Sequence, residues 1–342
     1  MHLLIPDILV APEAVRDIVA ALGLPGLVQL LGYGRLLESE GPQAELDRAM
    51  PATHWLLRAF HVPSDGLRPP LGPLMLLGES GKCTGTSWFA LQPCHFALAR
   101  DHVQLGDYAL DVTPAESSAL LAAARESLCE PETELLTGSN GSRWYYHHPA
   151  LEGLLTSEPA RSLGRNIEIW LPENGTGLKT DAARHWRKLH NEVQMIWHAH
   201  PVNAAREARG QATVNALWLF GGAALPAHQG ESAPAQLALR PGQDLFTGLA
   251  SWSKSQTVPR TVACDALVVL DELSDAATRE DWTAWRSALL GLEQTWFAPL
   301  ALQRRPLTIS LCAEHGWRTW EHRPRRAWQL RPPAPITRLL CA

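Results

Sequence analysis

The 342-residue chain has no apolar run that approaches the roughly 18 residues needed to cross a bilayer. Its first ten residues are apolar, but they lack a basic segment and are interrupted by Pro6 and Asp7, which is not the pattern of a secretory signal. The six cysteines are scattered without a C-x-x-C pair, so free thiols in a reducing compartment are favoured over disulfides or a cysteine-bound zinc ion. These absences predict a cytoplasmic protein with no membrane partner.

An excess of positive charge is absent as well. The chain has 30 lysines and arginines against 35 aspartates and glutamates, a formal net charge of −5, and such a chain produces no general field that attracts nucleic acid. A basic stretch near the C-terminus, residues 318–328, mixes arginine with tryptophan. Arginine on aromatic faces can bind phosphate. An edge strand with solvated charges accounts equally for this composition, and we expect no nucleic-acid partner.

Apolar residues are plentiful, because 46% of the chain is hydrophobic, which is enough for a large core. Short apolar runs, which predict buried strands, alternate along the chain with helical spacings. This alternation predicts an α/β fold with a mostly parallel central sheet flanked by helices on both faces. We expect one large α/β domain over residues 1–342. Within it, the segment from about residue 93 to residue 200 is predicted to form an inserted α+β subdomain. The predicted strands are residues 2–10, 74–77, 88–99, 103–110, 166–171, 213–220, 266–270 and 307–312, and residues 134–136 and 143–147 are predicted to form a hairpin.

Three helices have clear signals in the sequence. Residues 113–128 begin with a capping box, in which Thr113 is the cap and Glu116 lies three residues later. Residues 181–198 and residues 278–300 each repeat large apolar side chains at helical spacing. These segments predict long amphipathic helices that pack against a sheet.

Two common catalytic motifs are missing. Residues 77–84 (L-G-E-S-G-K-C-T) superficially resemble a phosphate-binding loop, but Leu76 stands where the first glycine is required and Cys83 where Ser or Thr is required. A flexible glycine turn is the better interpretation of this segment. The G-x-S-x-G elbow of many serine hydrolases is also absent.

Histidine pairs offer only a weak metal signal. His198 and His200 are two residues apart, a spacing that suits a strand, yet the pair falls at the end of a predicted helix. His147 and His148 are adjacent and would point apart. Because no third well-spaced ligand accompanies either pair, a histidine pair satisfied at a helix terminus is favoured over a metal site.

A group of carboxylates follows the predicted strand 266–270. Asp271 and Glu272 come directly after it, and Asp275 follows closely. Ligands of open α/β sheets bind at the carboxyl ends of the strands, which favours functional carboxylates here. A cluster of negative charges at a helix N-terminus explains the same residues, and the sequence leaves both interpretations open.

The most distinctive run of the chain is residues 200–222, H-P-V-N-A-A-R-E-A-R-G-Q-A-T-V-N-A-L-W-L-F-G-G. It resembles the H-P-x-N…R…G…x-N-x-x-W-x-x-G segment of the archaeal-type, cofactor-independent phosphoglycerate mutases. It is more similar still to a proteobacterial group of uncharacterised proteins often labelled phosphoglycerate mutase-like or pathogenicity-regulator-like. Three further stretches carry this similarity, R-W-Y at Arg143, G-R-N-I-E-I-W-L-P at Gly164 and W-R-K-L-H-N-E-V-Q-M at Trp186, so that the match spans residues of roughly 93–222.

The resemblance implies an alkaline-phosphatase-like fold with a divalent-metal site at the strand ends. Such mutases carry Asp-Gly after the first strand, a Ser or Thr nucleophile, Asp…Gly-His after a late strand and Asp-His near the last strand. Here Asp7 is followed by Ile8, Asp271 has no histidine close behind it, and Glu314 and His315 stand where Asp-His is expected. The candidate metal ligands are therefore Asp7, Asp271 and His315, and no catalytic nucleophile is identified.

The part of the pattern that survives contains Asn203, Arg206, Arg209 and Asn215, the candidate ligand-binding residues. Arginine binds phosphate with two parallel hydrogen bonds and needs no metal. We therefore expect a catalytically degenerate phosphoglycerate mutase-like protein, a pseudoenzyme, that binds a phosphorylated metabolite or a protein partner in a regulatory role without a cofactor. The alternative is an active cofactor-independent phosphoglycerate mutase, which is an isomerase, or a phosphatase, dependent on Mn or Zn.

Overall fold

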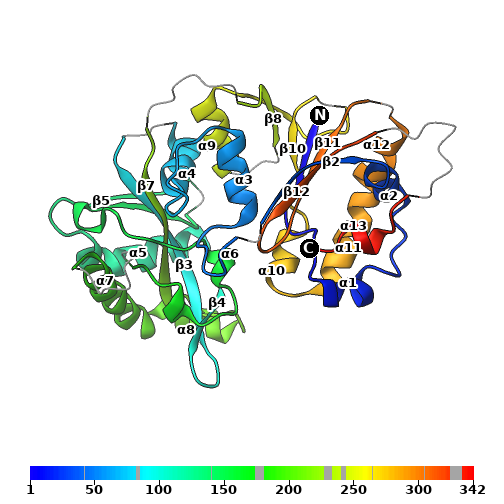
Figure 1. Cartoon of the computed structure of the whole chain (residues 1–342). Helices are drawn as coiled ribbons and strands as arrows, with labels where there is room; N and C mark the ends of the chain where they lie inside the picture. The colour runs from blue at the N-terminus through cyan, green and yellow to red at the C-terminus, as the bar shows by residue number, and fades with distance from the viewer. Residues whose placement is uncertain are drawn as a thin grey trace. The chain divides into compact units, whose positions relative to one another are not determined.

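A computed structural model describes residues 1–41, 43–81, 85–139, 141–173, 181–226, 233–239, 244–263, 265–303, 305–323 and 333–342. None of the helices in these ranges is both long and apolar enough to cross a membrane. The chain forms two compact units (Figure 1). Unit 1 comprises Met1–His61, Ser232–Gln243 and Lys254–Ala342, and unit 2 comprises Val62–Glu231 and Asp244–Ser253. Residues 93–200, predicted to form an inserted subdomain, all belong to unit 2.

Unit 1 is built on a seven-stranded sheet in the order β2-β12-β11-β1-β10-β8-β9. The strands from β11 to β9 are parallel, and β12 and β2 add an antiparallel margin. The parallel strands carry nearly continuous apolar runs, as expected for strands buried on both faces. The mostly parallel sheet predicted from the sequence is thus confirmed. Its strands are β1 (His2–Ile5), β2 (Arg35–Glu40), β8 (Gln236–Leu239), β9 (Gln256–Pro259), β10 (Leu267–Val269), β11 (Thr308–Cys312) and β12 (Trp317–Glu321).

Helices cover both faces of this sheet. On one face, Leu3, Val268 and Ile309 share a hydrophobic core with helices that include α2 and α11. On the other face lies α3, whose Trp55 meets the His2 ring edge-on at 4.9 Å between centroids. The predicted helix over residues 278–300 is interrupted by a π-helical turn, Glu293–Phe297. The helices are α1 (Pro12–Ile18), α2 (Pro25–Leu31), α3 (Pro51–Ala59), α10 (Ser274–Thr278), α11 (Trp282–Leu292), α12 (Ala298–Leu302) and α13 (Ile336–Leu339).

Unit 2 contains a second, antiparallel sheet of five strands around the long strand β3 (Figure 1). One face packs on α5 and α7, and the other on α4 and α9. The strands are β3 (Ser87–Leu98), β4 (Val103–Asp107), β5 (Glu134–Thr137), β6 (Trp144–His147) and β7 (Ala216–Ala224). The helices are α4 (Leu71–Ser80), α5 (Pro114–Leu128), α6 (Pro159–Ser162), α7 (Asp181–His198), α8 (Pro201–Ala208) and α9 (Asp244–Ser253).

Predictions from local sequence were correct where a side chain bonds to the backbone in a known capping pattern. The capping box of α5 is present, because the Glu116 N–H donates to Thr113 Oγ1 and the Glu116 carboxylate accepts from the Thr113 N–H. The strand predicted at residues 74–77 is wrong, since these residues lie inside α4; four apolar residues do not distinguish a buried strand from a buried helix. The strand predicted at residues 166–171 is also wrong. There the Asn166 side chain accepts the Glu168 N–H and starts a 3₁₀ turn.

Helices α4 and α9 of unit 2 approach each other at two glycines. A Cβ atom placed on Gly248 would overlap the carbonyl oxygen of Leu74, and one on Gly78 would overlap the carbonyl oxygen of Asp244. The helices therefore pack backbone against backbone, and neither contact can relax by moving a flexible side chain. Only glycine fits at this crossing.

We predict that Gly248→Ala lowers the free energy of unfolding by about 1–3 kcal/mol, the usual cost of forcing extra atoms into a packed contact. Gly291→Ala is the matched control, because Gly291 also lies in a helix, α11, but a Cβ atom placed on it would meet no other atom within 4 Å. There the gain in helix propensity raises stability by up to about 1 kcal/mol. Chemical denaturation of both variants measures the contrast, and equal effects would contradict it.

Candidate functional site

The carboxyl ends of three neighbouring strands of unit 1 carry the predicted metal ligands. Strand β1 pairs in parallel with β10 on one side and with β11 on the other. Asp7, Asp271 and His315 follow these strands by two or three residues, so the topology brings their segments to one edge of the sheet. This is the edge at which ligands of parallel α/β sheets bind. That the three residues hold a metal stays a prediction.

Asp7 is held in an unusual backbone conformation at this edge. Its φ is +55°, a left-handed value that aspartate adopts more readily than most residues. The Trp285 indole N–H donates to its carbonyl oxygen at 2.9 Å. Desolvation raises the pKa of the Asp7 carboxyl to about 6, a hydrogen bond with the Ser274 side chain opposes that rise, and the nearby Glu314 carboxylate adds to it. Asp7 therefore takes up a proton near pH 6.

The Asp7–Ser274 contact has no counterpart in the sequence analysis, which found no hydroxyl in a nucleophile context. Ser274 begins the short helix α10, just after Asp271 and Glu272. A carboxylate beside a serine hydroxyl is an arrangement in which the hydroxyl can be activated as a nucleophile. Asp7 and Ser274 are far apart in the sequence, and they meet because β1 and β10 pair side by side in the sheet.

The acidic pair Asp271 and Glu272 already has a cation from the protein itself. Arg260 forms an ion pair with Glu272, and its Nη1 lies 3.6 Å from Asp271 Oδ1. The same Nη1 donates to the Val269 carbonyl at 2.8 Å, and the guanidinium carbon lies 5.6 Å from the centre of the Trp296 ring. The Arg260 side chain is only 11% exposed, so this positive charge is fixed at the strand end.

A pair of divalent ions needs several anionic ligands to offset the repulsion between the two ions. At this edge Asp271 and Glu272 share the single positive charge of Arg260, and a divalent ion bound to them would lie close to that fixed like charge. The donor set therefore does not fit a two-metal centre. Two buried polar atoms, Glu272 Oε2 and His315 Nδ1, have no hydrogen-bond partner among the described residues, so the edge has polar groups to offer a ligand.

The predicted ligand-binding residues belong to unit 2, whereas the predicted metal ligands belong to unit 1. The Asn203 side chain donates to the Trp197 and Val214 carbonyls at 2.8 and 2.9 Å and accepts the Val214 N–H at 2.8 Å. Asn215 makes a similar pair of hydrogen bonds to the backbone of Phe96. Both side-chain amides therefore hydrogen bond to backbone N–H and C=O groups as a neighbouring strand would, and they stabilise the start of β7.

The two arginines are joined by one carboxylate. Arg206 is 2% exposed, donates to the Ala212 and Asp111 carbonyls, and lies 3.1 Å from Glu116 Oε2. Arg209 is half exposed and reaches Glu116 Oε1 at 2.6 Å. Desolvation acts to raise the pKa of Glu116, but the hydrogen bonds from the Thr113 N–H and the arginines outweigh it and hold that pKa below the ordinary value. Phosphate binding by these residues stays a prediction, and any phosphate would compete with Glu116.

The histidine pairs of the sequence are separated by their local structure. His200 is the N-cap of α8, where its side chain accepts the Val202 N–H at 3.2 Å. His147 Nδ1 lies 2.8 Å from the Ser87 carbonyl, whereas His148 belongs to a different group of side chains. The prediction that the adjacent pair points apart is confirmed.

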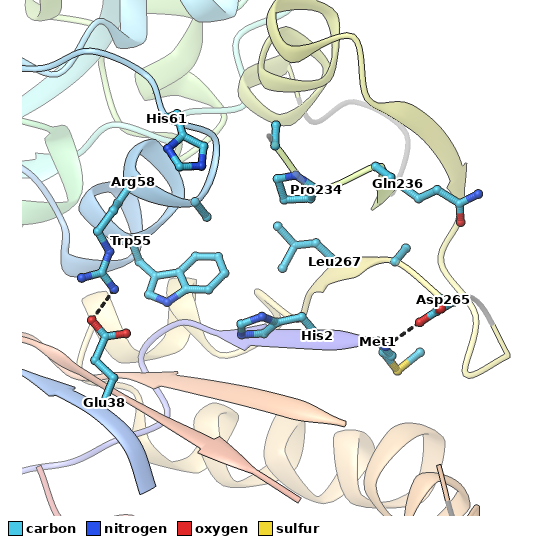
Figure 2. Close-up of a pocket in the computed structure, with 14 residues that line it drawn as sticks. Met1, His2, Glu38, Trp55, Arg58, His61, Pro234, Gln236, Asp265 and Leu267 are labelled. Carbon is cyan, nitrogen blue, oxygen red and sulfur yellow. Dashed lines mark hydrogen bonds and ion pairs between the residues drawn. The ribbon is translucent and has the colours of Figure 1, made fainter. Parts of the chain in front are cut away.

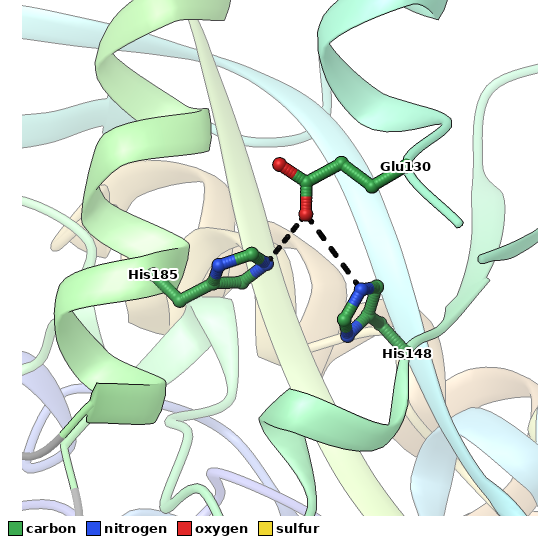
Figure 3. A group of neighbouring side chains, drawn as sticks. All are labelled: Glu130, His148 and His185. Atoms are coloured by element: carbon green, nitrogen blue, oxygen red, sulfur yellow. Dashed lines mark ion pairs between the residues drawn. The ribbon is translucent and has the colours of Figure 1, made fainter. Parts of the chain in front are cut away.

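That group is formed by Glu130, His148 and His185 of unit 2 (Figure 3). Glu130 follows α5, His148 follows β6, and His185 lies in the second turn of α7. Glu130 Oε2 lies 3.1 Å from His185 Nε2 and 3.7 Å from His148 Nε2. Within the described ranges, these are the three side chains of metal-binding type whose ligand atoms all lie within 4.8 Å of one another. No sequence pattern links these residues, because they come from three separate elements.

The proton position on His148 follows from its surroundings. Its Nδ1 accepts the Ala150 N–H at 3.0 Å, so in the neutral ring the proton is on Nε2, which faces Glu130. Desolvation and the neighbouring His185 lower the pKa of His148, against the pull of Glu130. Moving the proton to Nδ1 would cost the Ala150 hydrogen bond, about 1 kcal/mol. His185 Nε2 is buried and has no well-aligned hydrogen bond in the described chain.

A hollow of about 680 Å³ lies at the opposite, amino ends of β1 and β10 (Figure 2). Its charged groups are paired with one another: Arg58 lies 2.5 Å from Glu38, and the Met1 amine lies 2.5 Å from Asp265. Desolvation lowers the pKa of His2 to about 4, so this ring is neutral. With its charges paired in this way, the hollow has little to select a phosphorylated ligand, and it does not replace the carboxyl edge as the candidate site.

Known proteins offer little guidance for this chain. No protein-family model matches it, and no curated protein does. Among solved structures it is similar to a cofactor-independent phosphoglycerate mutase from Thermoplasma acidophilum DSM 1728, with 14% identity, a TM-score of 0.45, and coverage of 98% of this chain and 93% of that one. The PH0037 protein from Pyrococcus horikoshii matches with 12% identity, a TM-score of 0.45, and coverage of 94% and 87%.

The predicted distant resemblance to cofactor-independent phosphoglycerate mutases thus has a structural counterpart at low identity. The similarity to a proteobacterial, pathogenicity-regulator-like group stays a prediction. A TM-score of 0.45 assigns no activity to this chain.

The raised pKa of Asp7 predicts a specific pH dependence of stability. The folded protein keeps the Asp7 proton up to about pH 6, whereas the unfolded chain releases it near pH 3.8. The free energy of unfolding therefore falls as pH rises from about 4 to about 6. In Asp7→Asn, asparagine also tolerates positive φ, but it has no carboxyl group to titrate. As the pH rises through that range, the free energy of unfolding of the variant therefore increases by about 2–3 kcal/mol relative to that of the wild type.

Urea denaturation of both proteins between pH 4 and pH 7 measures this difference. Asp275→Asn serves as the control, because Asp275 is an exposed carboxylate on the same helix as Ser274. The control is expected to follow the wild-type curve. Parallel curves for wild type and Asp7→Asn would show that the Asp7 carboxyl is not desolvated.

Proposed function

We propose that this chain is a catalytically degenerate relative of metal-dependent phosphomutases, which binds a phosphorylated metabolite or a protein partner in a regulatory role in the cytoplasm. The observation that carries the proposal is the ion pairing of Arg260 with Asp271 and Glu272 at the carboxyl edge of the unit 1 sheet. This is the edge where such an enzyme would hold its metal ions. A protein cation stands there instead.

The positive charge of Arg260 is present at every physiological pH. A guanidinium group has a pKa above about 12 and stays charged at every physiological pH. A divalent ion that approached Asp271 and Glu272 would meet a like charge held by a backbone carbonyl and the Trp296 ring. It would also have to break two ion pairs in a partly desolvated position, where losing a partner is costly.

One observation favours the second candidate, an active metal-dependent mutase or phosphatase. The Ser274 hydroxyl is hydrogen bonded to Asp7 at the same edge. A serine at the start of a helix, beside a carboxylate, has the placement of a nucleophile with a base. In that case Ser274 and Asp7 act together, and loss of either removes activity.

We predict that the purified protein with Mn²⁺ neither interconverts 3-phosphoglycerate and 2-phosphoglycerate nor hydrolyses p-nitrophenyl phosphate above the rates of Ser274→Ala and Asp271→Ala. Both variants have lost the groups that the second candidate needs. A rate in the wild type that disappears in both would establish the enzyme instead. Ser255→Ala is the control, because Ser255 is a serine of unit 1 that directly precedes β9, at the amino end of a parallel strand and not at the carboxyl edge.

The binding proposal makes a separate prediction. Arg209 is half exposed and carries one of the two charges that Glu116 compensates, so a phosphate group can reach it. We expect 3-phosphoglycerate to raise the melting temperature of the wild type, with a stabilisation of about 2.7 kcal/mol at 100 times Kd. Arg209→Gln should abolish the rise.

Arg184→Gln is the matched control, because Arg184 is an exposed arginine of unit 2 paired with Asp181. Arg209 is preferred to Arg206 because the buried Arg206 makes several hydrogen bonds that hold the fold. If 3-phosphoglycerate still raises the melting temperature of Arg209→Gln, the phosphate group binds at another place in the molecule. If it does not raise the melting temperature of the wild type, binding of a phosphorylated metabolite is rejected and binding of a protein partner is the remaining proposal.

A further inference from the structure

We propose that Glu130, His148 and His185 bind a single divalent ion of the zinc class, in a site of unit 2 that is separate from the strand-end edge of unit 1. The proposal does not rest on the function proposed above. It comes from three side chains on three elements that direct their ligand atoms to one point (Figure 3). Two imidazoles and one carboxylate form a donor set that zinc uses in proteins.

The distances fit the size of such an ion. Zinc binds nitrogen and oxygen at about 2.0–2.2 Å in a tetrahedron, so two of its ligand atoms lie about 3.3–3.6 Å apart. Glu130 Oε2 is 3.1 Å from His185 Nε2 and 3.7 Å from His148 Nε2. The remaining pair, the two histidine nitrogens, lies within 4.8 Å, and the two rings must approach each other for both to bind one ion.

The surroundings of the three side chains suit a metal better than a proton. His185 Nε2 is buried and has no well-aligned hydrogen bond among the described residues, so an ion that binds there breaks no directional hydrogen bond. No arginine or lysine forms an ion pair with Glu130 in the described part of the chain, where its carboxylate pairs with the two rings. The carboxylate therefore has no fixed cation to displace.

The site leaves room for a fourth ligand. His148 is 9% exposed, while the side chains of His185 and Glu130 are 24% and 29% exposed. Three protein ligands and an open side are the arrangement in which zinc keeps a water molecule. We infer that a water completes the tetrahedron from the solvent side.

Binding requires one rearrangement of a proton. The proton on His148 Nε2 moves to Nδ1, so the ring stays neutral and its Nε2 lone pair turns to the ion. The Ala150 N–H then loses its acceptor. One cap hydrogen bond, about 1 kcal/mol, is a small loss beside coordination of a divalent ion by three side chains.

A bound ion would link three elements of unit 2. Glu130 follows the end of α5, His148 follows the end of β6, and His185 lies near the start of α7, and these elements share one hydrophobic core. Since the unfolded chain has no preformed site, binding favours the folded state. Zinc should therefore raise the melting temperature of the protein, and a chelator should reverse that rise.

The test uses the full chain without a polyhistidine tag, freed of metal by a chelator. Titration with Zn²⁺ should give one ion per chain, and Co²⁺ should give the visible absorption of a tetrahedral complex. His185→Gln and Glu130→Gln should each weaken Zn²⁺ binding by at least about tenfold and lose the zinc-dependent rise in melting temperature. His198→Gln is the control, because His198 lies exposed at the other end of the same helix.

Melting of the metal-free proteins checks that each variant folds, and the two substitutions on different elements give independent chances of a folded variant. The proposal is overturned if the wild type binds no stoichiometric Zn²⁺, or if both variants bind Zn²⁺ as tightly as the wild type. If His198→Gln weakens Zn²⁺ binding as much as His185→Gln does, the ion is bound elsewhere, and the proposal is overturned as well.

Discussion

The carboxyl edge of the unit 1 sheet depends on one guanidinium group. Parallel strands bring Asp7, Asp271 and Glu272 to one edge, and a cluster of carboxylates with reduced solvation requires a counter-charge. Arg260 supplies it from the connection between β9 and β10, anchored by a backbone carbonyl and an aromatic ring. Because the cation belongs to the chain, the edge keeps its acidic residues paired without depending on a dissolved ion.

A second carboxylate shows the opposite arrangement. Glu130 in unit 2 faces two imidazoles, whose lone pairs can be given to a metal, whereas the guanidinium beside Glu272 has none to give. The partner of a carboxylate therefore decides whether a site is closed to cations or open to them. This difference is not visible from the carboxylates alone, since both follow ordinary elements of secondary structure at partly exposed positions.

The run that gave the sequence its resemblance has a structural role in unit 2. His200 caps α8, Asn203 and Asn215 fasten the start of β7, and Arg206 ties the same region to Asp111 and Glu116. Each of these side chains satisfies backbone groups that would otherwise be buried without partners. A motif can therefore persist because it builds a corner of the fold, so its presence is not by itself a sign that the associated chemistry has been kept.

The sequence by itself determined the elements whose signals are local. Continuous apolar runs located β1, β10 and β11, although β1 ends at Ile5 and not at the predicted residue 10. The capping box at Thr113 specified the start of α5, because burial of a strand and capping of a helix depend on neighbouring residues. It did not separate helix from strand at residues 74–77. Only the tertiary structure decided which carboxylate meets Arg260, that Ser274 meets Asp7, and that Glu130 meets two histidines. Those contacts join residues distant in the chain, and their energies depend on distances that no local pattern encodes.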